Sequence, residues 1–153
     1  MPRATVPVLG AVLLVGVTVL LAVGLLVATT GFALPQPTDH VVIEVTADAA
    51  SGQVTLTHAG GPAEDVRSLR FRVEVDGQPL AEQPPVPFYA AAGFNGFPTG
   101  PFNPAADPTW SAGEVASFRV AGTNDPPLER GATLSVTVFR DGQPIAKAST
   151  TVS

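Results

Sequence analysis

The chain of 153 residues contains no cysteine. This absence excludes disulfide bridges, cysteine-ligated metal sites, a thiol nucleophile and a lipidated N-terminal cysteine. The sequence also lacks an N-glycosylation sequon, because none of Asn95, Asn103 and Asn124 has a serine or threonine two positions further on. No glycine-rich phosphate loop leads from a strand-like segment into a helical one, so that class of nucleotide site is not expected.

Positive charge is also scarce. Beyond residue 38 the chain carries 13 acidic residues against 7 basic ones, and Lys147 is its only lysine. A protein that binds nucleic acid needs a basic surface to displace counterions, so no nucleic-acid partner is predicted. The acidic composition fits a surface adapted to high salt, and it also fits an ordinary acidic secreted domain.

Residues 4–38 contain no charged side chain at all. Within them, Val8 to Ala28 is a run of 21 residues interrupted only by three glycines and one threonine. A helix of ~20 apolar residues is long enough to cross the hydrocarbon core of a membrane. The sequence therefore predicts an N-terminal membrane-inserting helix. The single Arg3 ahead of it favours a cytoplasmic N-terminus and an extracellular domain.

The N-terminal segment fits more than one kind of leader. Gly31-Phe32-Ala33 has the small-x-small pattern of a signal-peptidase site, and cleavage after Ala33 would release a soluble secreted domain. The apolar run is longer than the ~7–15 residues of an ordinary signal peptide, and the preceding basic region is very short. These features favour a helix that stays on the protein, as in an uncleaved membrane anchor.

Residues 3–10, Arg-Ala-Thr-Val-Pro-Val-Leu-Gly, resemble the start of archaeal type IV pilins, especially those of haloarchaea. Thr5-Val6 departs from the usual Val-Ser pair, and Leu9 stands where bacterial pilins have a glutamate. A second similarity lies in His58–Gly61 and Leu69–Gly77, which resemble the His-x-Gly-Gly and Val-x-Val-Asp-Gly pattern of the same family.

This resemblance implies that a prepilin peptidase removes a leader, residues 1–4, by cutting at the site formed by Arg3, Ala4 and Thr5. It also implies that the hydrophobic helix, residues 5–34, holds the precursor in the membrane and then packs against identical or related subunits. A hinge at 35–38 and an extracellular domain at 39–153 complete the predicted organisation. Small residues suited to close helix packing are Gly10, Gly16, Thr18, Ala22, Gly24 and Ala28. Such residues are also simply frequent in membrane helices.

Beyond the prolines of the hinge, apolar residues recur with the period of two that is typical of strands. The residues predicted to face inward are Val41, Ile43, Val45 and Ala47; Val54 and Leu56; Leu69, Phe71, Val73 and Val75; Ala116, Phe118 and Val120; and Leu134, Val136 and Val138. Asp76-Gly77 and Asp141-Gly142 predict type I′ hairpins. The prolines that follow them are compatible with the beginning of the second strand or with a strand at a sheet edge. We predict an all-β domain, an immunoglobulin-like sandwich of about seven strands.

One long segment, residues 83–113, breaks the strand pattern with seven prolines, four glycines and a single charge. It contains six aromatic residues: Phe88, Tyr89, Phe94, Phe97, Phe102 and Trp110. Loops of this length are often functional. Three roles remain open: covering the core of the domain, forming a subunit interface, or presenting a surface for carbohydrate or another ligand.

Residues suited to catalysis are few. His40 and His58 are predicted at strand edges, away from any nucleophile, and Glu64-Asp65 in a solvated turn. No enzyme activity, cofactor or metal site is predicted. The favoured interpretation is a pilin-like subunit of an archaeal surface filament that serves adhesion. The alternative is a single-pass membrane-anchored binding module that uses the aromatic loop.

Overall fold

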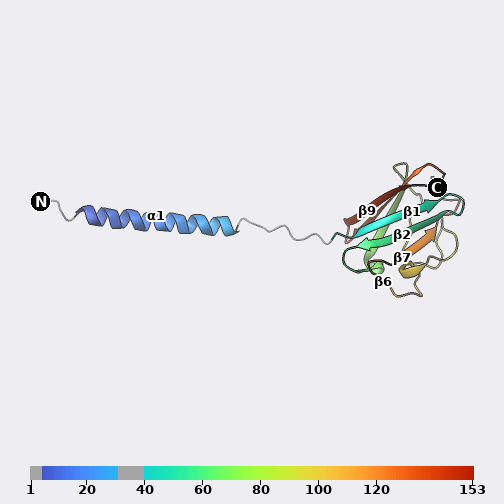
Figure 1. Ribbon diagram of the computed structural model, residues 1–153, viewed down its shortest axis with the longest axis horizontal. Helices are drawn as coiled ribbons and strands as arrows, with labels where there is room; N and C mark the ends of the chain where they lie inside the picture. The colour runs from blue at the N-terminus through green and yellow to red at the C-terminus, as the bar shows by residue number, and fades with distance from the viewer. Residues whose placement is uncertain (1–4, 31–39) are drawn as a thin grey trace. The chain divides into compact units, whose positions relative to one another are not determined.

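The computed structural model describes residues 5–30 and 40–153 (Figure 1). The chain divides into two units, Met1–Thr38 and Asp39–Ser153, and each is described by itself. Arg3 and Ala4 of the predicted processing site, residues 31–34 of the predicted helix and the predicted hinge at 35–38 lie outside the described residues.

The first unit contains one helix, α1 (Thr5–Thr30), of 26 residues. Pro7 lies in its first turn, where the missing N–H of proline breaks no helical hydrogen bond. Its first turn holds no acidic residue and its last turn no basic one. In the part of the chain that the structure describes, no helix combines the length and the hydropathy needed to span a membrane. The predicted membrane-spanning helix is therefore not confirmed.

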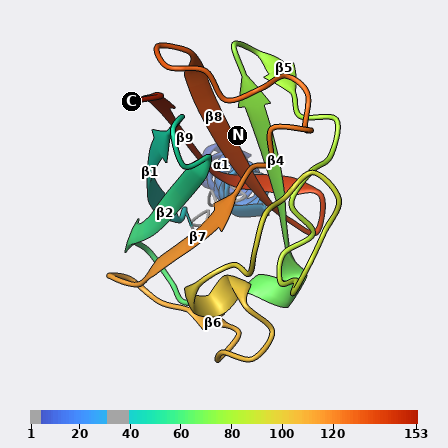
Figure 2. The same cartoon turned by 90° about the vertical axis from the view of Figure 1, so that its right-hand side faces the viewer.

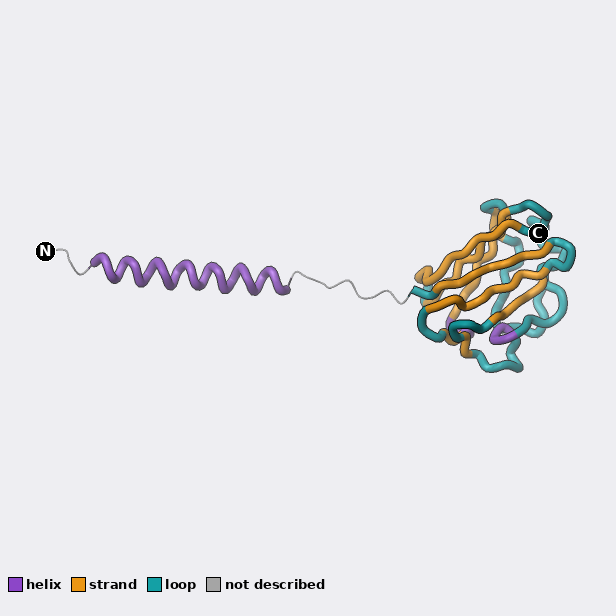
Figure 3. The backbone as a smooth tube through the Cα atoms, viewed as in Figure 1, coloured by secondary structure: helices purple, strands orange, loops and turns teal. Residues whose placement is uncertain are grey.

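The second unit is an antiparallel β domain (Figures 2 and 3). Its longer strands are β1 (Val42–Asp48), β2 (Gln53–Gly60), β4 (Leu69–Val75), β7 (Val115–Arg119), β8 (Thr133–Arg140) and β9 (Gln143–Thr151). The two-residue strands are β3 (Glu64–Asp65), β5 (Gln78–Pro79) and β6 (Thr109–Trp110), and the 3-10 helices are η1 (Val66–Ser68) and η2 (Gly100–Phe102).

The strands form a sheet of order β1-β2-β7, a sheet of order β5-β4-β8-β9 and the small pair β3-β6. Ser153, two residues after the end of β9, links the two larger sheets. Its N–H donates to the Ala47 carbonyl and its carbonyl accepts from the Ala49 N–H, both at 3.0 Å. The mostly β composition agrees with the predicted sandwich. The immunoglobulin-like assignment stays a prediction.

The core follows the alternation of the strands. All the residues predicted to face inward on the five segments are buried, among them Val54, Leu56 and Val136, which are wholly inaccessible. Both sheets thus place one face of apolar side chains in a single core, while their other faces carry Thr, Ser, Gln and charged residues. The predicted period of two is confirmed for β1, β2, β4 and β8. In β7 the outward-facing Ser117 is also buried, because Thr99 covers it and bonds its hydroxyl.

Both predicted hairpins are type I′ turns. Asp76 and Gly77 have φ values of 50° and 80°, and Asp141 and Gly142 have values of 51° and 78°. Positive φ at both central residues is the condition for this turn, which explains the Asp-Gly pairs. The prolines that follow belong to β5 and β9, the two outer strands of their sheet, where a missing N–H interrupts no interior ladder.

We expect residues 39–153 to fold without the preceding segment. The core of the β domain is built from residues 41–152, so deletion of residues 1–38 removes no buried core residue. The fragment should show a β-type circular dichroism spectrum and one cooperative thermal transition. A fragment that is disordered in both low and high salt would contradict this expectation.

Candidate functional site

The aromatic segment, residues 83–113, supplies much of the domain core. Four of its six aromatic side chains, Phe88, Phe94, Phe102 and Trp110, are at least nine-tenths buried. The rings of Phe102 and Trp110 meet with centroids 5.4 Å apart, and Phe102 also meets Phe71 of β4 at 4.9 Å. These four residues therefore cover the sheets, and the interface or ligand role considered for them is wrong.

The buried amide of Asn124 and the half-buried amide of Gln83 hold the start of this segment in place by hydrogen bonds to backbone groups. The Asn124 side chain accepts from the Glu82 N–H at 3.1 Å and donates to the carbonyls of Glu82 and Gly93. The Gln83 side chain pairs with the backbone of Val73 as a neighbouring strand would. It accepts from the Val73 N–H at 2.7 Å and donates to the Val73 carbonyl at 3.0 Å. Neither amide could be assigned a role from the sequence, because partners such as Glu82 for Asn124 and Val73 for Gln83 are distant in the chain and only folding brings them near.

Two aromatic side chains of the segment remain on the surface. Tyr89 is 55% exposed and Phe97 is 71% exposed. The ring of an exposed phenylalanine forms no hydrogen bond with water. Covering it with another surface is therefore favourable, because apolar area is removed from water. The aromatic contact surface predicted from six residues is thus reduced to these two.

Over residues 7–23, where its side chains are described, the surface of α1 is apolar on all sides. Large side chains more than 45% exposed occur along it from Val8 to Val23 at successive positions: Val8, Leu9, Val12, Leu13, Leu14, Val15, Val17, Val19, Leu20, Leu21 and Val23. A Cβ built at Gly10 or Gly16 meets no other atom, so both small residues leave open space on this surface. The Thr18 hydroxyl donates to the carbonyls of Leu14 and Val15, which hides its polarity.

The other predicted packing positions are only partly described. Ala22 is exposed. The side chains of Thr5 and Ala28, and the surroundings of Gly24, lie outside what the structure describes. Contacts between copies of the helix therefore stay a prediction for this surface.

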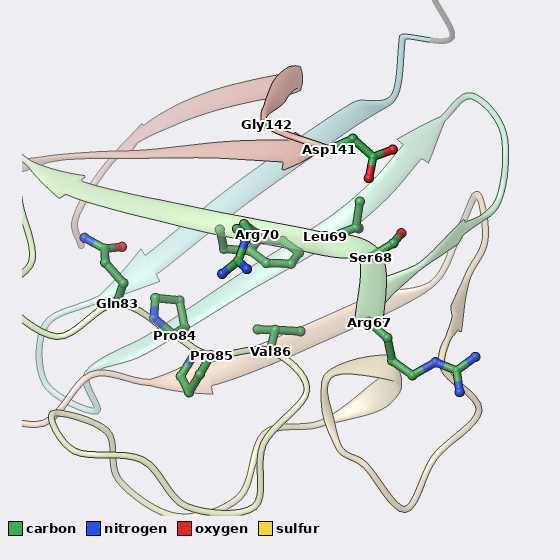
Figure 4. Close-up of a pocket in the computed structure, with 11 residues that line it drawn as sticks. Arg67, Ser68, Leu69, Arg70, Gln83, Pro84, Pro85, Val86, Asp141 and Gly142 are labelled. Carbon is green, nitrogen blue, oxygen red and sulfur yellow. The ribbon is translucent and has the colours of Figure 1, made fainter.

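A hollow of about 760 Å³ lies beside β4 (Figure 4). Leu69, Arg70 and Phe71 line it on the strand side, and residues 83–86 line it opposite. Backbone groups alternate in direction along an antiparallel strand, so the Phe71 N–H and carbonyl face the same side of β4 as those of Val73, which pair with the Gln83 side chain. Pro84 and Pro85 have no backbone N–H and cannot donate a hydrogen bond to this side of β4. The lining contains one serine and no histidine, so it provides no Ser–His pair for nucleophilic catalysis.

The paired carboxylates Glu64 and Asp65 have different surroundings. Glu64 is only 4% exposed and forms an ion pair with Arg140 of β8, so its predicted place in a solvated turn is wrong. Asp65 is exposed, as predicted, and pairs with Arg67. Hydrogen bonds from the Arg67 side chain and backbone N–H lower the pKa of Asp65 to about 2.

The two histidines also differ. His40 is exposed, whereas His58 is fully buried on β2, which corrects its predicted place at a strand edge. The His58 Nε2 atom lies 2.9 Å from the Pro62 carbonyl, and the imidazole meets the Trp110 ring edge-on at 5.3 Å. His58 therefore packs as a core residue beside the aromatic segment. Among the described residues, no cluster of His, Asp or Glu is arranged to hold a metal ion.

Comparisons with known proteins add little to this description. No protein-family model matches the chain. No curated protein matches it either. Among solved structures, the chain is similar to the archaellum periplasmic stator protein FlaG from Sulfolobus acidocaldarius, with a TM-score of 0.41 and 12% sequence identity over 71% of this chain and 95% of that chain. A similarity of this size carries no argument about function.

Proposed function

We propose that this protein is a structural subunit of an archaeal type IV pilus-like surface filament that serves adhesion. The observation that carries the proposal is the surface of α1, which exposes large apolar side chains at successive positions from Val8 to Val23. A helix that is apolar on all sides needs an apolar environment all round, either lipid or other helices. In a filament, neighbouring copies of α1 would provide it.

The processing step is part of the same proposal and rests on the sequence of residues 3–10. The uncharged segment holds the precursor in the cell membrane with its N-terminus in the cytoplasm and its β domain outside. A prepilin peptidase then removes residues 1–4. Because α1 carries no charge, leaving lipid for a bundle of identical helices breaks no ionic contact and exposes no ionised group to hydrocarbon.

We predict that the mature chain begins at Thr5. Mass spectrometry of the protein isolated from native membranes and from sheared filaments measures its N-terminus directly. A chain that begins at Leu34 would contradict both the filament and the anchor interpretations, because it lacks the helix. An intact Met1 would instead favour a simple anchor.

The alternative function is a membrane-anchored binding module. The exposure of Tyr89 and Phe97 favours it, because both come from the segment that otherwise covers the core. The two functions differ in where the protein is found. A filament subunit is recovered in the sheared fraction of the cell surface, whereas an anchored module stays with the membrane.

A further inference from the structure

A small hollow of about 190 Å³ lies where residues 95–99 meet β2 and β7. Gln53 of β2 and Arg119 of β7 stand opposite each other in the sheet register. Both side chains point away from the core, since their neighbours Val54 and Phe118 are buried. Gln53 and Arg119 therefore lie side by side on the outer face of the β1-β2-β7 sheet, and both line the hollow.

The segment that carries Phe97 is attached to the free edge of β7. The Asn95 N–H donates to the Arg119 carbonyl and the Thr99 N–H donates to the Ser117 carbonyl, each at 2.9 Å. Between these two anchors the chain bulges outward. Phe97 is held at this bulge and lines the hollow.

Two of the polar side chains that line this hollow, Asn95 and Arg119, retain their full hydrogen-bonding capacity. The Thr99 and Ser117 hydroxyls bond each other at 2.8 Å, and the Gln53 amide donates to the Thr55 hydroxyl at 3.4 Å. The amides of Gln83, Asn103 and Asn124 are all engaged with backbone groups. Within residues 40–153, by contrast, no hydrogen bond or ion pair involves the Asn95 amide or the Arg119 guanidinium. Arg119 is thus a cation without a carboxylate partner in the described part of an acidic chain.

We propose that this hollow binds an acidic saccharide, with a uronic-acid unit as the recognised group. A sugar ring has an apolar C–H face, which suits the exposed ring of Phe97. The Arg119 guanidinium matches the geometry of a carboxylate and forms charge-assisted hydrogen bonds with it. The amides of Asn95 and Gln53 both donate and accept, as the hydroxyl groups of a sugar require.

This proposal extends the proposed function in adhesion by naming the class of ligand, an acidic saccharide. The site itself lies in the β domain and does not depend on α1. The small volume, about 190 Å³, suits one sugar unit of a longer chain. Around it, this face carries the hydroxyl-bearing residues Thr46, Thr55 and Thr57, and the carboxylates of Glu44 and Asp48 lie on the same face along β1. Loss of saccharide binding would leave the filament proposal intact, and the absence of filaments would leave the saccharide site intact.

The test uses the full chain in detergent micelles, with a trimer of galacturonic acid as the probe and a trimer of galactose as the neutral comparison. We expect saturable binding of the acidic trimer by calorimetry or by NMR titration, and weaker binding of the neutral one. Phe97→Ala should weaken binding of the acidic trimer about tenfold, the effect of losing ~1.4 kcal/mol. Arg119→Gln should remove the preference for the acidic trimer.

Two matched variants control the test. Tyr89→Ala removes the other exposed aromatic ring of the same segment, and Arg130→Gln removes an arginine that does not line the hollow. Both should bind the acidic trimer like the wild type. The proposal is overturned if the wild type shows no saturable binding, if it binds both trimers equally, or if Tyr89→Ala lowers affinity as much as Phe97→Ala. Unchanged thermal transitions establish that the variants are folded.

Discussion

Replacing Trp110 by alanine is expected to lower the free energy of unfolding by about 3–5 kcal/mol, the range for truncating a large buried aromatic side chain. The indole is fully buried and lies against His58 and Phe102, with centroid distances of 5.3 and 5.4 Å. Its Nε1–H donates to the Glu114 carbonyl at 3.2 Å. The variant would therefore leave a cavity in the core and remove one of the two N–H donors to the Glu114 carbonyl, the other being the His58 N–H at 3.0 Å.

Tyr89→Ala provides the matched control. Tyr89 belongs to the same segment but is 55% exposed, so its truncation should change the free energy of unfolding by less than about 0.5 kcal/mol. Denaturant titration followed by circular dichroism measures both variants, since Trp110 is the only tryptophan available for fluorescence. A cost below about 1 kcal/mol for Trp110→Ala would mean that the segment does not stabilise the core as described.

Replacing Gly16 by leucine is expected to reduce recovery of the protein in sheared filaments by about tenfold, since overpacking a close interface costs at least ~1 kcal/mol. A Cβ at Gly16 meets no atom within the helix, and leucine favours helix more than glycine does. The substitution therefore adds bulk to the outer surface without harming the helix itself. Total protein in the membrane fraction should be unchanged.

Leu20→Met is the control for this experiment. Leu20 is 74% exposed on the same helix, and methionine keeps its apolar character and nearly its volume. Immunoblots of sheared and membrane fractions should show this variant distributed like the wild type. If Gly16→Leu also enters filaments like the wild type, Gly16 has no packing role. If wild-type protein is missing from the filament fraction, the filament proposal itself fails. Gly24→Leu extends the test to another of the small residues predicted to pack against neighbouring helices.

The strands of the β domain could be predicted because their information is local. Alternation of apolar and polar residues marks the inward face of each strand, as in Leu69 to Val75, and burial follows that pattern. The Asp-Gly turns could be predicted for the same reason, since the conformation is decided by the two residues in it. The helix α1 likewise follows from an uninterrupted run of apolar residues.

The role of residues 83–113 could not be read in the same way. Their aromatic residues have no periodicity, and each ring is buried or exposed according to partners elsewhere in the chain. Phe102 is covered by Phe71 and Phe118 from both sheets, whereas Phe97 projects from a bulge. From its composition, the segment was expected either to cover the core of the domain or to form a contact surface for a subunit or ligand. Composition could not distinguish between these roles.

By itself, the sequence determined the uncharged helix, the inward faces of the strands, both type I′ hairpins and the absence of cysteine chemistry, because each depends on residues close together in the chain. Only the tertiary structure decided that His58 and Glu64 are buried, that Glu64 pairs with Arg140, and that Phe97 stands beside Arg119. Glu64 and Arg140 are 76 positions apart. Such pairings arise from the order in which strands assemble into sheets, and no local pattern of residues encodes that order.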